Sequence, residues 1–232
     1  MSTIVSLTFN RNLAKRTNKS PPPDEQLITA TALVVNEHTG KTQADVSVIW
    51  GSSGVSQGLL EFYGLDKEPL SSPVSTQTGP DGKAIVYVGS SQALIGQVTA
   101  NLSGRPLTTG TVVIATFNNP GTFTPLDPPQ LPIVDGIVRV PPGGGTAQGL
   151  IPRIPQQFVG GAYAVWIGNS NDPTGLGKLV EDPSMVPPSD VTFQVPYADM
   201  ALVPATNYLQ YMIYARNAAT FSRVLTFQAR KD

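Results

Sequence analysis

His38 is the one histidine of this 232-residue chain and therefore the first candidate for acid–base catalysis near neutral pH. It stands in the segment Glu-His-Thr-Gly, whose composition is typical of a turn between strands. Because the chain has no cysteine, a nucleophile activated by a histidine would have to be a hydroxyl group next to this residue. We interpret His38 as a surface turn residue and predict that the chain has no catalytic residues and is not an enzyme.

Four carboxylates gather in a proline-rich region of the second half: Asp172, Glu181, Asp182 and Asp190. Carboxylate oxygens are ligands that calcium prefers in proteins. The spacing of these residues matches no calcium-binding loop, however, and aspartate also caps backbone N–H groups in loops of this kind. We therefore expect neither a metal ion nor any other cofactor.

Arg11, Lys15, Arg16 and Lys19 form a basic run that contains no acidic residue. Such a run could contact nucleic acid or anionic lipid. The net charge of the whole chain is only −1, so no long-range field favours nucleic acid. The run is typical of a solvated linker, and we expect no nucleic-acid partner.

The composition indicates a folded protein with a weakly charged surface. Hydrophobic residues make up 40% of the chain and charged residues only 13%, so the surface must be built largely from Ser, Thr, Asn, Gln and Gly. Such surfaces suit extracellular β-modules and surfaces that pack on copies of themselves. No apolar run approaches the ~18 residues of a transmembrane helix, and the N-terminus lacks the layout of a secretory signal. Export would need a signal beyond this sequence or a leaderless route, and a cytoplasmic location stays open.

The elements that must position these residues are strands. Every second residue of the segments 28–34, 46–50 and 84–88 is apolar, which is the period of a strand with one buried face. Asp81-Gly82, just before the last of these segments, is a tight-turn signal because glycine accepts a positive φ. Trp50 ends the second inward set and is expected in the core.

The spacing of these strands predicts an all-β chain of two tandem β-sandwiches. About seven strands in about 90 residues predict the first sandwich over residues 24–117. Residues 118–130 are rich in proline and turn formers and are expected to be a linker. The same strand spacing predicts a second sandwich over residues 131–232, with Trp166 in its core.

Residues 1–23 precede the first sandwich and contain a short strand, the basic run and the triple proline 21–23. In the strand, Val5, Leu7 and Phe9 alternate with polar residues and are expected on one side. Two interpretations remain open. The strand folds back on its own sandwich, or it pairs with the exposed sheet edge of a neighbouring copy and so joins a homo-oligomer or filament.

Apolar side chains that point outward from strands can mark an interface. Phe62 and Tyr63 are adjacent on a strand, so one of them is expected to point outward. Ile85 and Tyr87 have the opposite parity to the inward set of their strand. The candidate interface residues are Val5, Leu7, Phe9, Phe62, Tyr63, Ile85 and Tyr87, with Tyr208 and Tyr214 as further outward aromatics.

Several segments of the first half resemble the bacterial Ig-like domain of group 1, the repeat of invasin- and intimin-type adhesins. The segments that carry the resemblance are Ile28–Val34, the turn with Gly40, Val46–Trp50, Asp81–Val86 and Val98–Ala100. The sequence departs from the family at Thr42-Gln43, where the family has proline and an apolar residue, and in the long insert 51–75. The second half is similar to modules that follow such repeats in large Gram-negative surface proteins, through Trp166-Ile167-Gly168, Val195-Pro196, Tyr211 and Ser222.

The resemblance implies two Ig-like domains of a non-enzymatic bacterial protein, extracellular or at the cell surface, with a structural or adhesive role. Its partner would be a glycan or protein receptor on a host or cell surface. Two alternatives remain open. The chain is a self-assembling filament or oligomer subunit joined through its N-terminal strand, or it is a carbohydrate- or receptor-binding module or a component of a secreted toxin.

Overall fold

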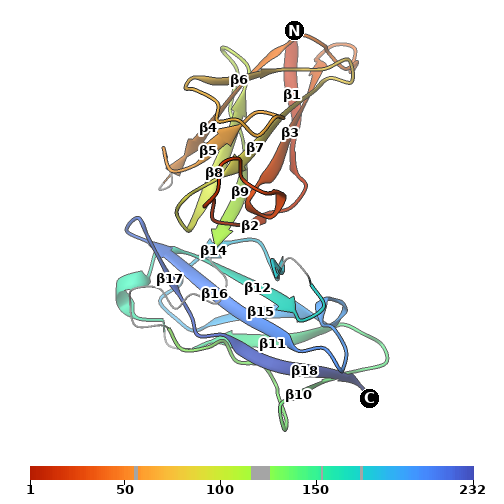
Figure 1. Cartoon of the computed structure of the whole chain (residues 1–232), viewed down its shortest axis with the longest axis vertical. Coiled ribbons are helices and arrows are strands. Elements are labelled where there is room, and N and C mark those ends of the chain that lie inside the picture. Colours follow the sequence, from red (N-terminus) through yellow and green to blue (C-terminus); the bar gives the residue numbers. More distant parts are fainter. Residues whose placement is uncertain (55–56, 116–125, 153, 173–174) are drawn as a thin grey trace. The chain divides into compact units, whose positions relative to one another are not determined.

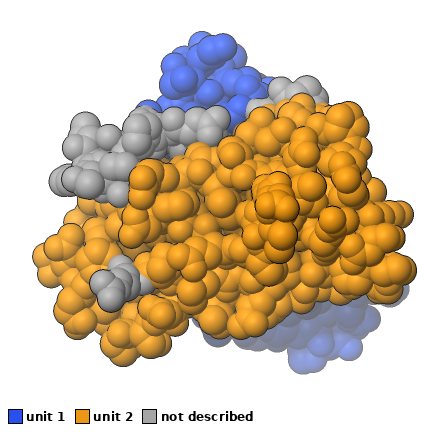
Figure 2. Space-filling view, turned by 90° about the horizontal axis from the view of Figure 1, so that it is seen from below, with its two compact units in different colours: residues 1–115 blue, residues 116–232 orange. Residues whose placement is uncertain are grey.

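The computed structural model of the chain describes residues 1–54, 57–115, 126–152, 154–172 and 175–232, which form strands, loops and short 3-10 turns (Figure 1). The chain divides into two compact units, residues 1–115 and 116–232, coloured separately in Figure 2. The all-β prediction is confirmed. No helical segment among the described residues has the length and hydropathy of a membrane span.

The first unit is a sandwich of two sheets. One sheet is antiparallel and has the strand order β1-β3-β7-β5, from β1 (Ser2–Phe9), β3 (Ile28–Asn36), β7 (Lys83–Gly89) and β5 (Glu61–Tyr63). The other has the order β2-β9-β8-β4-β6, from β2 (Leu13–Lys15), β9 (Thr108–Ala115), β8 (Leu94–Asn101), β4 (Ser47–Ser53) and β6 (Val74–Gln77). These orders correspond to the A-B-E-D and G-F-C sheets of an immunoglobulin-like fold, with β2 added at one edge of the second sheet and β6 at the other.

The core of the first unit follows the predicted alternation. Every second residue of β3 from Ile28 to Val34 is fully buried. Val86 of β7 lies opposite Ala30 and is also fully buried. Trp50 reaches the same interior from β4, where its indole Nε1–H donates to Thr76 Oγ1 at 2.8 Å. The inward sets that the sequence predicted in these strands are therefore confirmed.

The N-terminal segment belongs to both sheets of the first unit. β1 pairs antiparallel with β3, whereas β2, three residues further on, runs parallel to β9. Hydrogen bonds hold the crossing between the sheets, from Asn10 N to Thr29 O and from Val113 N to Asn12 O. The first strand therefore completes the sandwich of its own chain.

The second unit repeats this plan with a smaller second sheet. Its large sheet has the order β10-β18-β16-β12-β13, with β14 beside β12 and β17 beside β16. These strands are β10 (Ile137–Val140), β18 (Leu225–Lys231), β16 (Asn207–Ala215), β12 (Ala162–Asn169), β13 (Lys178–Leu179), β14 (Ser184–Met185) and β17 (Ala218–Phe221). The small sheet pairs β11 (Thr146–Ile151) with β15 (Val191–Pro196). β10 runs parallel to β18, as β2 does to β9.

The core of the second unit lies between these sheets. Tyr163, Val165 and Ile167 of β12 contribute to it, together with Phe193 and Val195 of β15. Trp166 alternates with the β12 residues and so lies on the other face of the large sheet. It is still only 2% exposed. The expectation that Trp166 is buried is confirmed, but its place is outside this core.

Part of the expected linker 118–130 is joined to the second unit. Leu126 N donates to Phe221 O at 3.0 Å, and Gln130 exchanges two backbone hydrogen bonds with Leu150. Residues 118–125 of that linker lie outside the described residues.

At Gly149 the small sheet leaves no room for a side chain beside the ring of Phe193, and this gives a testable prediction. It lies directly opposite Phe193, and a Cβ at Gly149 would overlap the Phe193 ring, which is only 2% exposed. We expect Gly149→Ala to lower the free energy of unfolding by about 1–3 kcal/mol, the usual cost of overpacking a core. Urea unfolding of the full chain measures this change.

Gly143→Ala is the matched control for Gly149→Ala, because a Cβ there meets nothing within 4 Å. It should change the free energy of unfolding by no more than about 0.5 kcal/mol. Equal stability of the two variants would show that β11 and β15 do not pair in this register.

Candidate functional site

His38 lies in an exposed turn, as the sequence predicted. The turn is held by Asn36, whose Oδ1 accepts the backbone N–H groups of His38 and Thr39 at 3.0 and 3.2 Å. Across the described parts of the chain, no three His, Cys, Asp or Glu side chains are grouped so as to hold a metal ion.

Asp172 and Glu181, two of the four carboxylates that the sequence singled out, accept hydrogen bonds. Asp172 Oδ2 accepts the backbone N–H groups of Leu176 and Gly177, both at 3.0 Å. This is the backbone capping expected of an aspartate in such a loop. Glu181 Oε1 accepts the hydroxyl of Tyr163 at 3.0 Å. Burial, and then the charge of Glu181, raise the pKa of the Tyr163 hydroxyl to about 12.

Residues 54–58 read Gly-Val-Ser-Gln-Gly, the Gly-x-Ser-x-Gly pattern of a serine nucleophile. Residues 55 and 56 of this segment lie outside the described residues. In enzymes with this motif the segment joins a strand to a helix. Here β4 ends at Ser53 and the next strand, β5, begins at Glu61, so the pattern lacks the context that gives it a catalytic meaning.

The three candidate interface residues of β1 do not lie on one side of the strand. A β-bulge between Ile4 and Ser6 leaves Val5 without a partner and 52% exposed. Ile4 takes the place opposite Val34 that alternation had given to Val5. The predicted common face of Val5 with Leu7 and Phe9 is therefore wrong, because the bulge adds one residue and reverses the parity.

Leu7 and Phe9 are half-buried on the inner face of β1, opposite Ala32 and Ala30. The ring of Phe9 extends to β9, where a Cβ added at Gly110 would overlap it. Phe9 therefore helps to close the edge of its own sandwich. Most of the exposed apolar surface of β1 comes from Val5 and from Met1 before it.

Phe62 and Tyr63 are each only 8% exposed. Phe62 lies opposite the buried Val88, whereas Tyr63 lies opposite Tyr87 on the outer face, so the expected parity holds. Tyr63 is nevertheless covered on this outer face, because the chain around Thr17 lies over this end of the sheet: Thr17 N donates to Ser90 O at 2.8 Å.

Ile85 and Tyr87 have the outward direction that their parity predicted. They lie opposite Thr31 and Thr29 of β3, and both are half-buried. No partner chain tests them as an interface, so that role stays a prediction. Of the seven candidates, the structure brings together Tyr63 and Tyr87 as a cross-strand pair on the outer face of the sheet.

Glu61 fastens the covering segment to the first sheet. Its Oε2 accepts the hydroxyl of Tyr63 at 2.5 Å and that of Thr17 at 3.1 Å, and its Oε1 accepts the N–H of Ser91 at 3.2 Å. Burial raises the pKa of Glu61, but these hydrogen bonds outweigh it and hold the pKa below its usual value. Burial, and then Glu61, raise the pKa of the Tyr63 hydroxyl to about 12.

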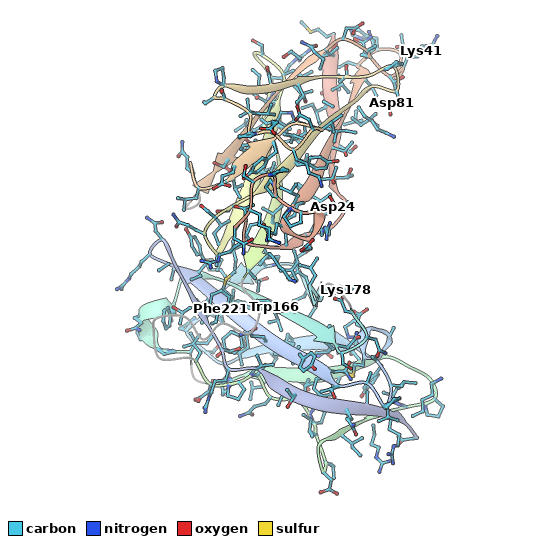
Figure 3. The ribbon with its side chains drawn as sticks, in the orientation of Figure 1. Asp24, Lys41, Asp81, Trp166, Lys178 and Phe221 are labelled. Atoms are coloured by element: carbon cyan, nitrogen blue, oxygen red, sulfur yellow. The ribbon has the colours of Figure 1, made fainter. Side chains whose placement is uncertain are left out.

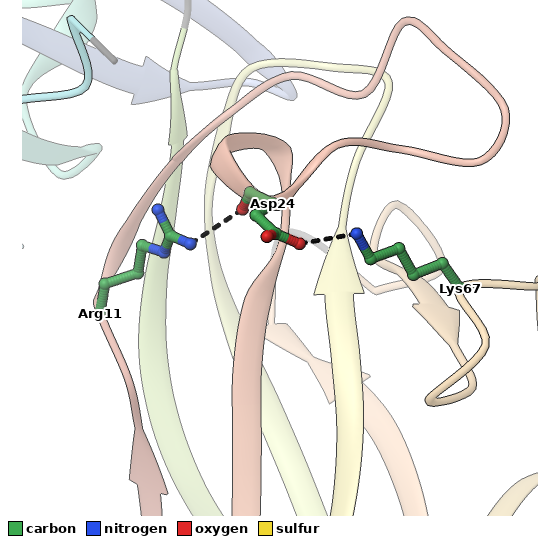
Figure 4. A network of polar contacts seen from close by, with 3 residues as sticks. All are labelled: Arg11, Asp24 and Lys67. Atoms are coloured by element: carbon green, nitrogen blue, oxygen red, sulfur yellow. Dashed lines mark hydrogen bonds and ion pairs between the residues drawn. The ribbon is translucent and has the colours of Figure 1, made fainter. Parts of the chain in front are cut away.

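A second polar group lies at the same end of the unit. Arg11 donates to the backbone oxygen of Asp24 at 2.9 Å, and Lys67 Nζ lies 2.6 Å from Asp24 Oδ1 (Figure 4). The hydrogen bond from Lys67 lowers the pKa of Asp24. The Asp24 side chain is 82% exposed, so this ion pair adds little stability. Arg11, part of the basic run, thus contacts its own chain.

The second unit carries a small pocket of about 90 Å³. It lies over the end of β12 and the start of β16, on the face of the large sheet opposite the core. Its described lining residues are Trp166, Gly168, Asn169, Gly175, Tyr208, Gln210 and Val224. None of these described residues is an Asp, Glu, Lys, Arg or His.

Sequence reasoning identified Tyr208 as an outward aromatic but placed Trp166 in the core and gave no role to Gln210. The signal that could have found the pocket is the spacing of Tyr208 and Gln210, which puts both side chains on one face of a strand. Nothing local to these residues shows that Trp166 and Gly168 lie opposite them.

No protein family and no curated protein matches this chain. Among solved structures it is similar to the D0–D1 domains of intimin, with 15% identity, a TM-score of 0.42 and coverage of 98% of this chain and 100% of that one. It is also similar to invasin, a bacterial integrin-binding protein, with 14% identity, a TM-score of 0.34 and coverage of 98% and 40%. A C-terminal fragment of intimin in complex with the intimin-binding domain of its translocated receptor matches with 11% identity, a TM-score of 0.36 and coverage of 97% and 64%. The chain spans less than two thirds of the length of each of the last two structures.

The hydrogen bonds of Glu61 give a prediction for stability and its pH dependence. Glu61→Gln removes a charged acceptor of three donors and should lower the free energy of unfolding by about 1 kcal/mol at pH 7, a value reduced for partial exposure. Because the folded-state pKa of Glu61 lies below its ordinary value of 4.5, this stability is present above pH 4.5 and is lost as the pH falls through the folded-state pKa. Urea unfolding at pH 7 and pH 3 measures both effects.

Glu68→Gln is the control for Glu61→Gln, because Glu68 is an exposed carboxylate in the same region. It should leave the unfolding free energy within about 0.5 kcal/mol of the native value at pH 7. A deficit of Glu61→Gln that is as large at pH 3 as at pH 7 would contradict the role given to the ionised carboxylate.

Proposed function

We propose that this chain is a non-enzymatic adhesion unit of a bacterial surface protein, in which two immunoglobulin-like sandwiches present a binding face. The observation that carries the proposal is the lining of the pocket on the second unit. It combines aromatic rings with neutral amides, which is the make-up of a site that binds without cleaving. Fold alone does not decide function, so the proposal rests on this site.

Several titratable side chains have structural roles, and this supports a function without catalysis. Glu61, Asp172 and Glu181 each accept hydrogen bonds that hold loops or a tyrosine in place. His38 is in an exposed turn with its backbone held by Asn36. A general base must lie within hydrogen-bond reach of the proton it removes and be oriented there, and this turn provides no such setting.

The similarity of residues 24–117 to the repeat of invasin- and intimin-type adhesins supports the location and the adhesive role. A chain in which only 13% of the residues are charged suits an extracellular β-module. We therefore place the protein outside the cell or at its surface, with a receptor on another surface as its partner.

The alternative of a filament joined through the N-terminal strand is not part of this proposal. β1 forms seven residue pairs with β3 of its own chain, so exchange between copies would have to break that ladder. Its bulge at Val5 also protects the outer edge, since bulged edges pair poorly with further strands.

Surface display tests the adhesive role. The chain is fused to a display carrier on a non-adherent bacterial strain, and attachment to cultured epithelial cells is counted. We expect attachment several-fold above that of cells with the carrier alone. Attachment equal to the carrier alone would overturn the proposal.

A variant that cannot fold its second unit gives the matched control for display. Phe193→Asp places a charge in the buried core of that unit, which costs far more than a core of this size can offset. Displayed at the same surface density, this variant should attach no better than the carrier. Undiminished attachment would show that adhesion does not depend on the second unit.

A further inference from the structure

We propose that the pocket on the second unit binds the acetamido group of an N-acetylated amino sugar. This inference rests on the proposed adhesive function and names the chemical class of its receptor. The shape of the pocket, its hydrogen-bonding groups and the lack of charge among its described lining residues each restrict the class of ligand that can bind.

The shape of the pocket comes from two neighbouring cross-strand pairs. Gly168 of β12 lies opposite Tyr208 of β16, and Trp166 lies opposite Gln210. All four have the same parity, so they share the face of the sheet that is turned away from the core. Gly168 has no side chain, so it contributes only backbone to the pocket wall, and a Cβ there would lie 3.5 Å from the Cα of Gly177.

Trp166 gives the pocket a rigid apolar floor. Its side chain is only 2% exposed, and its ring meets that of Phe221 edge to face, with centroids 6.3 Å apart and an angle of 78° between the planes (Figure 3). A ring fixed in this way needs no rearrangement when a ligand binds, which saves the entropy that ordering a mobile side chain would cost.

The two amides present one acceptor and one donor to a ligand. Gln210 is 4% exposed, and its Nε2 donates to Ser222 O at 2.8 Å, which leaves Oε1 to accept. Asn169 Oδ1 accepts the N–H of Asn171 at 3.0 Å, which leaves the Nδ2 hydrogens to donate. A secondary amide carries an N–H and a C=O and complements this pair. A ligand N–H could therefore donate to Gln210 Oε1, and the net contribution of such a hydrogen bond is usually modest.

The size and the charge of the pocket exclude other groups. Its volume of about 90 Å³ is well below the ~300–1,000 Å³ of pockets that enclose a drug-sized ligand, so it can take one substituent such as an acetamido group but not a whole hexose. None of the described lining residues carries a positive charge, so a phosphate or carboxylate would lose its hydration there without a counter-charge from them. The sugar ring stays outside, where Tyr208, 38% exposed, offers a flat aromatic surface.

NMR titration of the full chain tests the inference. N-acetylglucosamine and N-acetylgalactosamine are the probes, and glucose, which lacks the acetamido group, is the matched comparison. We expect the backbone amide signals of Gly168, Asn169 and Tyr208 to shift with either probe at millimolar concentration. Affinity for the probes should exceed that for glucose about tenfold, the effect of one well-placed hydrogen bond and its contacts.

Two variants and a control locate the binding. Gly168→Ala fits sterically, since a Cβ there meets only Gly177 at 3.5 Å or more, yet it narrows the pocket. Tyr208→Ala removes the aromatic surface. Both should weaken binding about tenfold or more. Met185→Ala truncates a side chain of the same unit that is 72% exposed and does not line the pocket, and it should bind as the native chain does.

The outcomes separate this inference from the proposed function. Absence of shifts, equal shifts with glucose, or unchanged binding by both pocket variants overturns the inference. If displayed cells still attach in that case, the adhesive function stands and its receptor has another chemistry. If the sugar binds but displayed cells do not attach, the inference stands and the adhesive function fails.

Discussion

The inner face of β3 sets the architecture of the first unit. Its four inward residues between Ile28 and Val34 are fully buried, and β3 has a partner on each side, β1 and β7. A shift of the pairing by one residue would turn this whole set to the solvent, so the register is strongly specified. Two of the four are alanines, and Trp50 of the other sheet is also buried, with 4% of its surface exposed.

The second unit shows a different use of the same plan. β12 is buried on both faces in its middle, with Val165 in the core and Trp166 on the opposite face. A strand that is buried on both faces has a continuous apolar sequence, so an alternating pattern does not show which of its residues face the core. The small pocket lies on the Trp166 face of β12, where Gly168 follows two residues later and adds no side chain.

Charged groups in both units mainly hold loops and edges. Glu61 and Thr17 tie the chain after β2 over the end of the first sheet, and Asp172 holds the loop after β12. In a chain with few charged residues, these contacts leave polar but neutral surfaces for recognition. A pocket lined by aromatic rings and neutral amides is consistent with the small number of charged residues. Such a pocket would suit a receptor of neutral sugars better than an ionic receptor.

The sequence by itself determined the all-β class, the inward sets of the main strands and the turn at Asp81-Gly82, where Gly82 has φ +75° and Asp81 Oδ1 accepts the N–H of Lys83. These features follow from local periodicity and backbone preferences. Only the tertiary structure decided the bulge at Val5, the covering of Tyr63 and the pocket around Trp166. Each depends on which residue lies opposite another across strands far apart in the chain, and no local pattern encodes that register.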